Sequence, residues 1–329
     1  MTQLRNQPTP GVACPEKLPS YGGQALIEGV LMRGSRAVAA AMRAPDGKIV
    51  IHTEDLTGIY KAGWSKLPFI RGVTGLWDAL GLGMRFLMMS AELQGDEEPP
   101  KDGKRPHPPA GGIKTFLLTT TLSIFLGEGM FFTMALSLLL AVALFFAMPA
   151  VVGHYAAEWL GLNNWWSSVI EGVVRFVAVI GYIWGVGRMP EIQRVYQYHG
   201  AEHKTINAFE DGAELTPENV MRYPLEHPRC GTAFLLTLVV FSVILFSLLG
   251  PLPGVWRVAS RLILLPVLAG VAYEYLRFTA NHIDNPFIRW LVVPNLALQK
   301  LTTREPDRGM VEVAITAFTT MKEQEEAAA

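Results

Sequence analysis

This chain of 329 residues has few cysteines and almost no net charge. Only Cys14 and Cys230 occur, and both fall in regions assigned below to the reducing side of a membrane, so a structural disulfide is not expected. The net charge is −1 at pH 7 and no basic block stands out, which argues against a general nucleic-acid binder. Residues 1–20 carry four prolines and no apolar core, so this leader is predicted to be disordered and not a cleavable signal peptide.

The chain is rich in long apolar runs and poor in charged residues. Charged residues make up 17% of the chain and hydrophobic residues 50%, which is too apolar for an ordinary soluble enzyme of this size. Four runs reach or exceed the roughly 20 residues that a helix needs to cross a hydrocarbon core: 113–150, 166–187, 231–250 and 258–280. We therefore predict a polytopic α-helical membrane protein with about four transmembrane helices.

Lysine and arginine are distributed unevenly around these runs. Fourteen precede residue 115, none lies in 151–165, five lie in 188–229, and six follow from Arg277 onward. Cytoplasmic loops carry the excess of these residues. Both termini and the central loop are therefore predicted to be cytoplasmic, and the loop 151–165 to lie on the other side.

The segment 21–94 is predicted to form a cytoplasmic α+β unit. Two β-prone runs, 36–42 and 48–53, flank the turn Ala44-Pro45-Asp46-Gly47 and indicate a hairpin. The stretch 22–34 lacks the Gly-Lys-Ser/Thr ending of a phosphate-binding loop, so we expect its glycines to serve tight backbone turns.

The end of this unit is ambiguous in sequence. Residues 72–93 combine internal glycines with mixed polarity, which favours a helix lying on or dipping into the membrane surface. A buried helix of a soluble unit is the alternative interpretation. Residues 95–112, rich in Pro, Asp, Glu and Lys, are predicted to form a solvated linker before the first two transmembrane helices of 113–187.

The central loop, 188–230, contains the pattern His-x-x-Glu-His at His199, Glu202 and His203. On a helix this spacing puts all three on one face, so two imidazoles can bind one divalent ion while the carboxylate stays free to move a proton. It is the inverted zincin signature, in which Glu202 would be the general base. The alternative is a solvated polar face, because so short a pattern also recurs by chance.

Three further residues are candidate ligands. Glu274 lies near the cytoplasmic end of the last apolar run, 71 residues after His203, where a third zincin ligand is expected. A structural ion pair with Arg277 or Arg175 is its alternative role. His227 and Cys230 are competent ligands for a borderline ion, although a cysteine at a helix start is often inert packing.

Two other intramembrane carboxylates need a partner or a function. Glu128 interrupts the first run, whereas Glu171 and Arg175 are four apart in the second and are predicted to form a structural ion pair. The tail, 281–329, is predicted to be cytoplasmic and to fold back on the hairpin, with a final helix over about 311–322.

Four ordered motifs resemble the bacterial YqhQ-like family, and the resemblance covers nearly the whole chain. They are Gly22-Gly23-Gln24-Ala25 through Glu28-Gly29-Val30, His199 to Lys204, His227 to Thr232, and Leu301 to Pro306 followed by Glu312-Val313-Ala314. The resemblance implies a polytopic protein of the bacterial inner membrane, from a domain family of unknown function that is commonly described as a predicted metal-dependent enzyme. It implies no substrate.

Together these features predict a metal-dependent membrane enzyme with a cytoplasmic-facing site, with hydrolysis as the leading chemistry. His199 and His203 would hold zinc or a similar divalent ion, with Glu274 or His227 as a third ligand. The position of the site at the membrane boundary favours a lipid, lipid-linked or membrane-protein substrate. A non-enzymatic scaffold or assembly factor is the alternative, whereas the lack of an internal repeat argues against a transporter.

Overall fold

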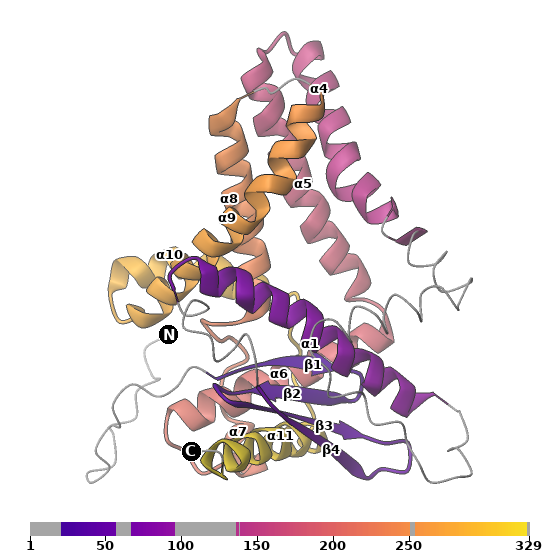
Figure 1. Cartoon of the computed structure of the whole chain (residues 1–329), viewed down its shortest axis with the longest axis vertical. Coiled ribbons are helices and arrows are strands. Elements are labelled where there is room, and N and C mark those ends of the chain that lie inside the picture. The colour runs from indigo at the N-terminus through magenta and orange to yellow at the C-terminus, as the bar shows by residue number, and fades with distance from the viewer. Residues whose placement is uncertain (1–20, 57–66, 96–135, 138, 251–253, 328–329) are drawn as a thin grey trace.

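The computed structural model describes residues 21–56, 67–95, 136–137, 139–250 and 254–327. The predicted leader, the predicted linker, Cys14 and Glu128 lie outside these ranges. The described part has two layers (Figure 1): a bundle of long helices and, beneath it, a small β-sheet with helices on both of its faces. This is the predicted combination of apolar helices with an α+β portion.

The sheet has four antiparallel strands in the order β1-β2-β3-β4. The strands are β1 (Gly22–Leu26), β2 (Gly29–Arg33), β3 (Ala37–Arg43) and β4 (Ile49–Asp55). The predicted hairpin is confirmed as β3 and β4, with Gly47 at φ 86° in its turn. The hairpin of β1 and β2 was not predicted, because its turn places Glu28 at φ 52°, a conformation that glycine or asparagine usually marks.

Helices bury both faces of the sheet. Helix α1 (Ile70–Gln94) covers one face, where its Phe86 is fully buried against Leu31 and Val38. Helices α6 (Pro190–Glu210) and α11 (Arg308–Ala327) cover the other face and contact Val30 and Met32. Burial on both faces explains why β2 is apolar at successive positions.

Helix α1 and the C-terminal helix α11 each pack against other parts of the chain. Helix α1 lies between the sheet and α9 (Gly254–Asn281) and packs against both, whereas Met84 and Met88 are exposed, so its position relative to a membrane stays a prediction. The C-terminal helix α11 packs on β2, β3 and α6, which agrees with the predicted return of the tail to the hairpin. Short helix α7 (Pro217–Val220), capped by Thr216 as its sequence indicates, contacts α11.

Four stretches are long and apolar enough to cross a membrane. They are Leu139–Trp159, Asn164–Val186, Gly231–Leu249 and Ile263–Asn281. The first comprises a π-helical turn, η3 (Ala143–Ala147), and α4 (Met148–Trp159), the second is α5 (Asn164–Val186), the third is α8 (Gly231–Leu249), and the fourth belongs to α9.

The prediction of a loop over residues 151–165 was wrong for most of its length. The helix continues to Trp159 despite Pro149, and Gly161, whose φ is 66°, follows its end. Asn163 then caps α5 by accepting hydrogen bonds from the backbone N–H groups of Trp165 and Trp166. The connection is therefore much shorter than the predicted loop 151–165.

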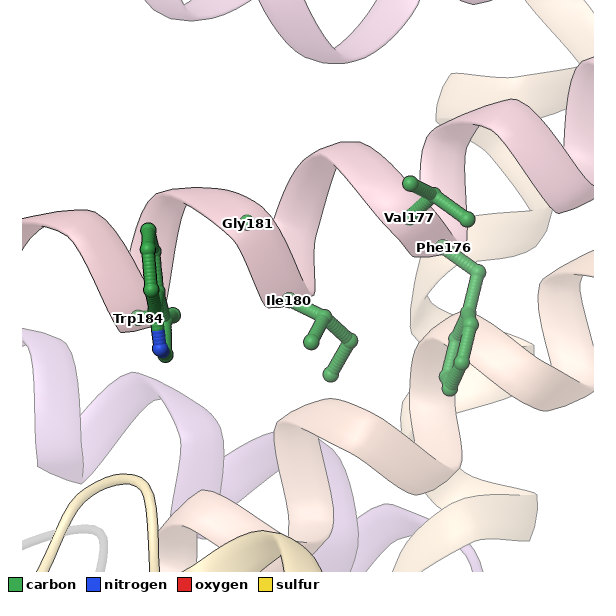
Figure 2. Close-up of a pocket in the computed structure, with 5 residues that line it drawn as sticks. All are labelled: Phe176, Val177, Ile180, Gly181 and Trp184. Carbon is green, nitrogen blue, oxygen red and sulfur yellow. The ribbon is translucent and has the colours of Figure 1, made fainter.

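The long helices carry one ion pair that the sequence predicted. Arg175 donates to Glu171 at 2.7 Å and also to the Phe145 carbonyl. The outer surface of α5 is apolar, and a hollow of about 350 Å3 there is lined by five residues of that helix (Figure 2). The five residues are Phe176, Val177, Ile180, Gly181 and Trp184.

Candidate metal centre

Three of the predicted ligands lie together at the junction of α6 and α8. Pro190 opens α6 and Gly212, at φ 73°, follows its end, so His199 and His203 lie in the middle of a regular helix. Cys230 is the N-cap of α8, and its Sγ lies 3.3 Å from His199 Nε2. The ligand atoms of the two histidines and Cys230 all lie within 4.8 Å of one another.

Backbone carbonyls orient both imidazole rings. His199 Nδ1 contacts the Thr302 carbonyl at 2.9 Å, and His203 Nδ1 contacts the Leu225 carbonyl. A carbonyl oxygen only accepts, so each ring donates from Nδ1, and in the neutral form of each ring the lone pair is on Nε2. Metal-binding histidines are commonly held in this way by their second nitrogen. Within the described part of the chain, His203 Nε2 is buried without a hydrogen-bond partner.

Glu202 lies on the same helix face and is only 4% exposed. Its carboxylate accepts a hydrogen bond from the Gly23 N–H, while its Oε2 has no partner among the described residues. A Cβ at Gly23 would lie 2.8 Å from Glu202 Cδ and 2.6 Å from the Leu31 carbonyl oxygen, so this approach requires glycine. Burial raises the pKa of Glu202, against the opposing effect of the two imidazoles.

The Cys230 thiol and the His199 imidazole change each other's pKa. Burial alone would raise the pKa of Cys230, but the neighbouring His199 and His203 outweigh it and hold that pKa well below its ordinary value. Burial lowers the pKa of His199, yet the Cys230 thiolate raises it to about 9. The thiolate is the form of cysteine that binds metals and acts as a nucleophile.

Side chains of α6 also bind the loop that leads to Cys230. Lys204 Nζ and Asn207 Nδ2 each donate to two carbonyls of this loop, and His203 donates to a fifth. The acceptors are the carbonyls of Met221, Tyr223, Pro224, Leu225 and Glu226. These bonds fix the loop against the helix and so set the position of Cys230 relative to His199.

His227 lies beside the three-residue group without joining it. Its ring centroid is 5.8 Å from that of His203, and its Nε2 is 3.5 Å from a Glu210 carboxylate oxygen. Its backbone exchanges two hydrogen bonds with the Gln299 side chain, at 2.9 and 2.8 Å. Burial lowers the pKa of the His227 ring, which keeps it uncharged beside the cluster.

The structure does not bring Glu274 to this group. Both of its carboxylate oxygens accept from the Arg71 guanidinium, and Oε1 also accepts from the Phe69 N–H at 3.1 Å. Because Arg71 belongs to α1, the pair ties α1 to α9, and neither Arg277 nor Arg175 is its partner.

All four motifs of the sequence meet around α6. Glu28 forms an ion pair with Arg194, and a Cβ at Gly200 would overlap the Arg304 carbonyl oxygen. Lys204, besides binding the loop, forms an ion pair with Glu305 at 2.7 Å. Sequence reasoning missed the supporting roles of Gly23, Gly200, Leu225, Gln299 and Thr302, for which the only available signal was their place in or next to these motifs.

Comparison with known proteins agrees with the resemblance. The model of the family described as "Protein of unknown function (DUF1385)" matches residues 67–324. The uncharacterized protein YqhQ of Bacillus subtilis (strain 168) is 33% identical over 312 residues, which cover 91% of each chain. No solved structure matches. The chain therefore belongs to the DUF1385 family of YqhQ-like proteins.

Proposed function

We propose that this protein is a metal-dependent membrane enzyme, a hydrolase whose metal ligands are His199, His203 and Cys230. The observation that carries the proposal is the orientation of both histidines by carbonyls, which leaves their Nε2 atoms beside the Cys230 sulfur. Two imidazoles and a thiolate are a donor set that suits zinc. His203 Nε2, a buried acceptor with no partner among the described residues, supports an ion at this position.

The residues around the ligands have separate roles in this proposal. A zinc ion held by three protein ligands supplies a Lewis acid and lowers the pKa of a bound water. Glu202 accepts the proton of the attacking water at its Oε2, while the Gly23 N–H holds the carboxylate in place. Hydrolysis at a carbonyl or phosphoryl centre follows as the reaction class.

The same proposal places the site at the cytoplasmic boundary of the bacterial inner membrane. The four apolar helices would insert with both termini inside, which the distribution of lysine and arginine supports. Cys230 immediately precedes α8, so the ligands lie at the end of an inserted helix. A lipid, a lipid-linked molecule or a membrane protein would reach this position, and the apolar hollow on α5 suits an acyl chain.

The test is elemental analysis of the detergent-purified full chain. About one zinc or other transition ion per chain is expected in the wild type, and near zero in His199→Ala and His203→Ala. Glu202→Gln should keep the ion and lose metal-dependent hydrolysis of lipid or peptide esters. The absence of metal after reconstitution would falsify the metal site, and rapid alkylation of Cys230 in that protein would assign the Cys230–His199 pair to a thiol nucleophile instead.

A structural metal site in a scaffold or assembly factor is the second candidate. It is favoured by the way the ligands join distant parts of the chain, since α6, α8 and the Thr302 backbone all meet at the three donors. X-ray absorption spectroscopy separates the two functions. A fourth ligand from the protein indicates a closed structural site, whereas an oxygen from water in the fourth position supports the enzyme.

A further inference from the structure

Helix α10 (Pro286–Gln299) leaves large aromatic side chains exposed, although two of its three polar side chains, Asn295 and Gln299, face the protein. Asn295 donates to the Thr237 hydroxyl at 3.2 Å, and Gln299 is fully buried. Phe287 and Trp290 are 66% and 69% exposed. A surface helix of a protein in water normally exposes polar side chains and buries its aromatic ones.

Contacts on the inner face of α10 fix its rotation about its own axis, so the helix cannot turn its exposed apolar side chains inward. Its inner face is held by the Asn295 bond and by the two hydrogen bonds between Gln299 and the His227 backbone. Ile288 and Val292 are buried on that same face. The outward face therefore meets whatever surrounds the protein at this level.

The position of α10 identifies that surrounding. Thr237 is six residues into α8, about 9 Å along a stretch that is long and apolar enough to cross a membrane. In Figure 1, α10 lies at the edge of the molecule, between the bundle of long helices and the sheet layer. Leu235 of α8 and Phe278 of α9 are also exposed, and α10 contacts both of these helices.

We propose that α10 is embedded in the lipid boundary of the leaflet that faces the motif helix. Phe287, Trp290 and Val293 enter the acyl-chain region, and Arg289, the one charged residue of the helix, lies at the headgroups. The inference rests on the proposed insertion of the four long helices and is independent of the metal. It moves residues 286–299 out of the cytoplasmic tail and into the membrane surface.

The C-terminal end of α10 leads directly into the backbone that supports the candidate metal centre. Gln299, the last residue of α10, holds the His227 backbone, and Thr302, three residues later, accepts from His199. The backbone that supports the ligands is thus anchored to a lipid-embedded helix. A substrate that moves laterally in this leaflet would meet the site without leaving the bilayer.

Depth-resolved fluorescence quenching tests the proposal on the full chain in phosphatidylcholine–phosphatidylglycerol vesicles. A bimane label is placed on Trp290→Cys in a Cys14→Ser background, with the unsubstituted background protein as the correction for the buried Cys230. Val177→Cys on α5 is the control inside an inserted helix, and Lys48→Cys in the β-hairpin is the control in water. Val293→Cys repeats the measurement if Trp290→Cys does not fold.

The expected result is that the label at residue 290 is quenched at least twofold more by lipid with a 5-doxyl chain than by aqueous iodide. Residue 177 should respond more to a 12-doxyl chain and residue 48 only to iodide. Iodide quenching at 290 with lipid quenching at 177 overturns the proposal and leaves the inserted helices intact. Loss of lipid quenching at both positions means that the helices are not inserted. Cross-linking between chains at 290, without lipid quenching, means that a second copy covers the face.

Discussion

Two groups of ionisable side chains lie at the base of the long helices, and they differ in how completely they are satisfied. In the Arg71–Glu274 pair, both carboxylate oxygens are taken by the guanidinium and the Phe69 N–H adds a further bond. In the His199–His203–Cys230 group, a buried imidazole nitrogen has no partner within the described residues. A pair that satisfies itself needs no ligand, whereas a bound ion would satisfy the unpartnered Nε2 of His203 beside a second imidazole and a thiol.

The largest effect is expected from a substitution that displaces the backbone behind His199 in the candidate metal centre and leaves the three candidate ligands unchanged. In Gly200→Ala the new methyl group overlaps the Arg304 carbonyl oxygen, so the backbone that carries Thr302 must move away from His199. Metal affinity is expected to fall about 10- to 100-fold, as for lost support of a ligand. Titration with a competing chelator measures it. Gly185→Ala, where a Cβ meets nothing within 4 Å, is the control and should leave affinity unchanged.

The His199–His203–Cys230 group should release protons when it binds a metal ion. The pKa of His199 is raised to about 9, so below that pH the ring is protonated and the ion must displace the proton. Apparent zinc affinity is therefore expected to rise about tenfold per pH unit from pH 7 toward 9. Calorimetry in buffers of different ionisation enthalpy should show proton release on binding. In Cys230→Ser the release should fall, since the thiolate that raises the His199 pKa is gone.

Loss of the Arg71–Glu274 pair is expected to change the stability of the fold and not its metal content. Glu274→Gln leaves the Arg71 guanidinium without its counter-charge, at a cost of about 2 kcal/mol in the free energy of unfolding. The metal content should not change, because the pair is separate from the three ligands. A double-mutant cycle with Arg71→Met, read by thermal unfolding in detergent, isolates the coupling. Loss of metal in Glu274→Gln would return this residue to the ligand set.

The smallest effect concerns the ion pair that holds the first hairpin to α6. The Arg194 hydrogen bond lowers the pKa of Glu28, so the carboxylate stabilises the fold above its unfolded pKa and this stabilisation is lost as the pH falls through the lower folded value. Glu28→Gln should cost about 1 kcal/mol at pH 7, because Arg194 is half exposed. The difference in melting temperature from the wild type should shrink below about pH 4.5. A constant difference down to pH 3 would contradict this.

The sequence predicted most of the helices because their signals are local. The apolar runs and the turn Ala44-Pro45-Asp46-Gly47 each mark an element through neighbouring residues. Strands β1 and β2 lacked such a mark, because Glu28 occupies a turn position that glycine or asparagine usually announces. Their apolar residues were visible, but the turn between them was not.

The candidate site was predictable only as far as side-chain type allows. His199, His203 and Cys230 were found because imidazole and thiol are recognisable ligands. The carbonyls of Thr302 and Leu225 were missed, because every residue has a carbonyl and nothing in the sequence says where it points. Glu274 had a suitable spacing along the chain, but its partner lies 203 residues away, and spacing does not determine contact.

The distance along the chain between His199 and Thr302, 103 residues, has a consequence for biogenesis. A ribosome that has completed the first turn of α8 has already made all three donor atoms, but the carbonyl that orients the His199 ring is made only after the last long helix. We expect metal loading to be a late step that follows helix insertion. A nascent chain released before residue 302 should bind the ion weakly, so stable loading would report that assembly is complete.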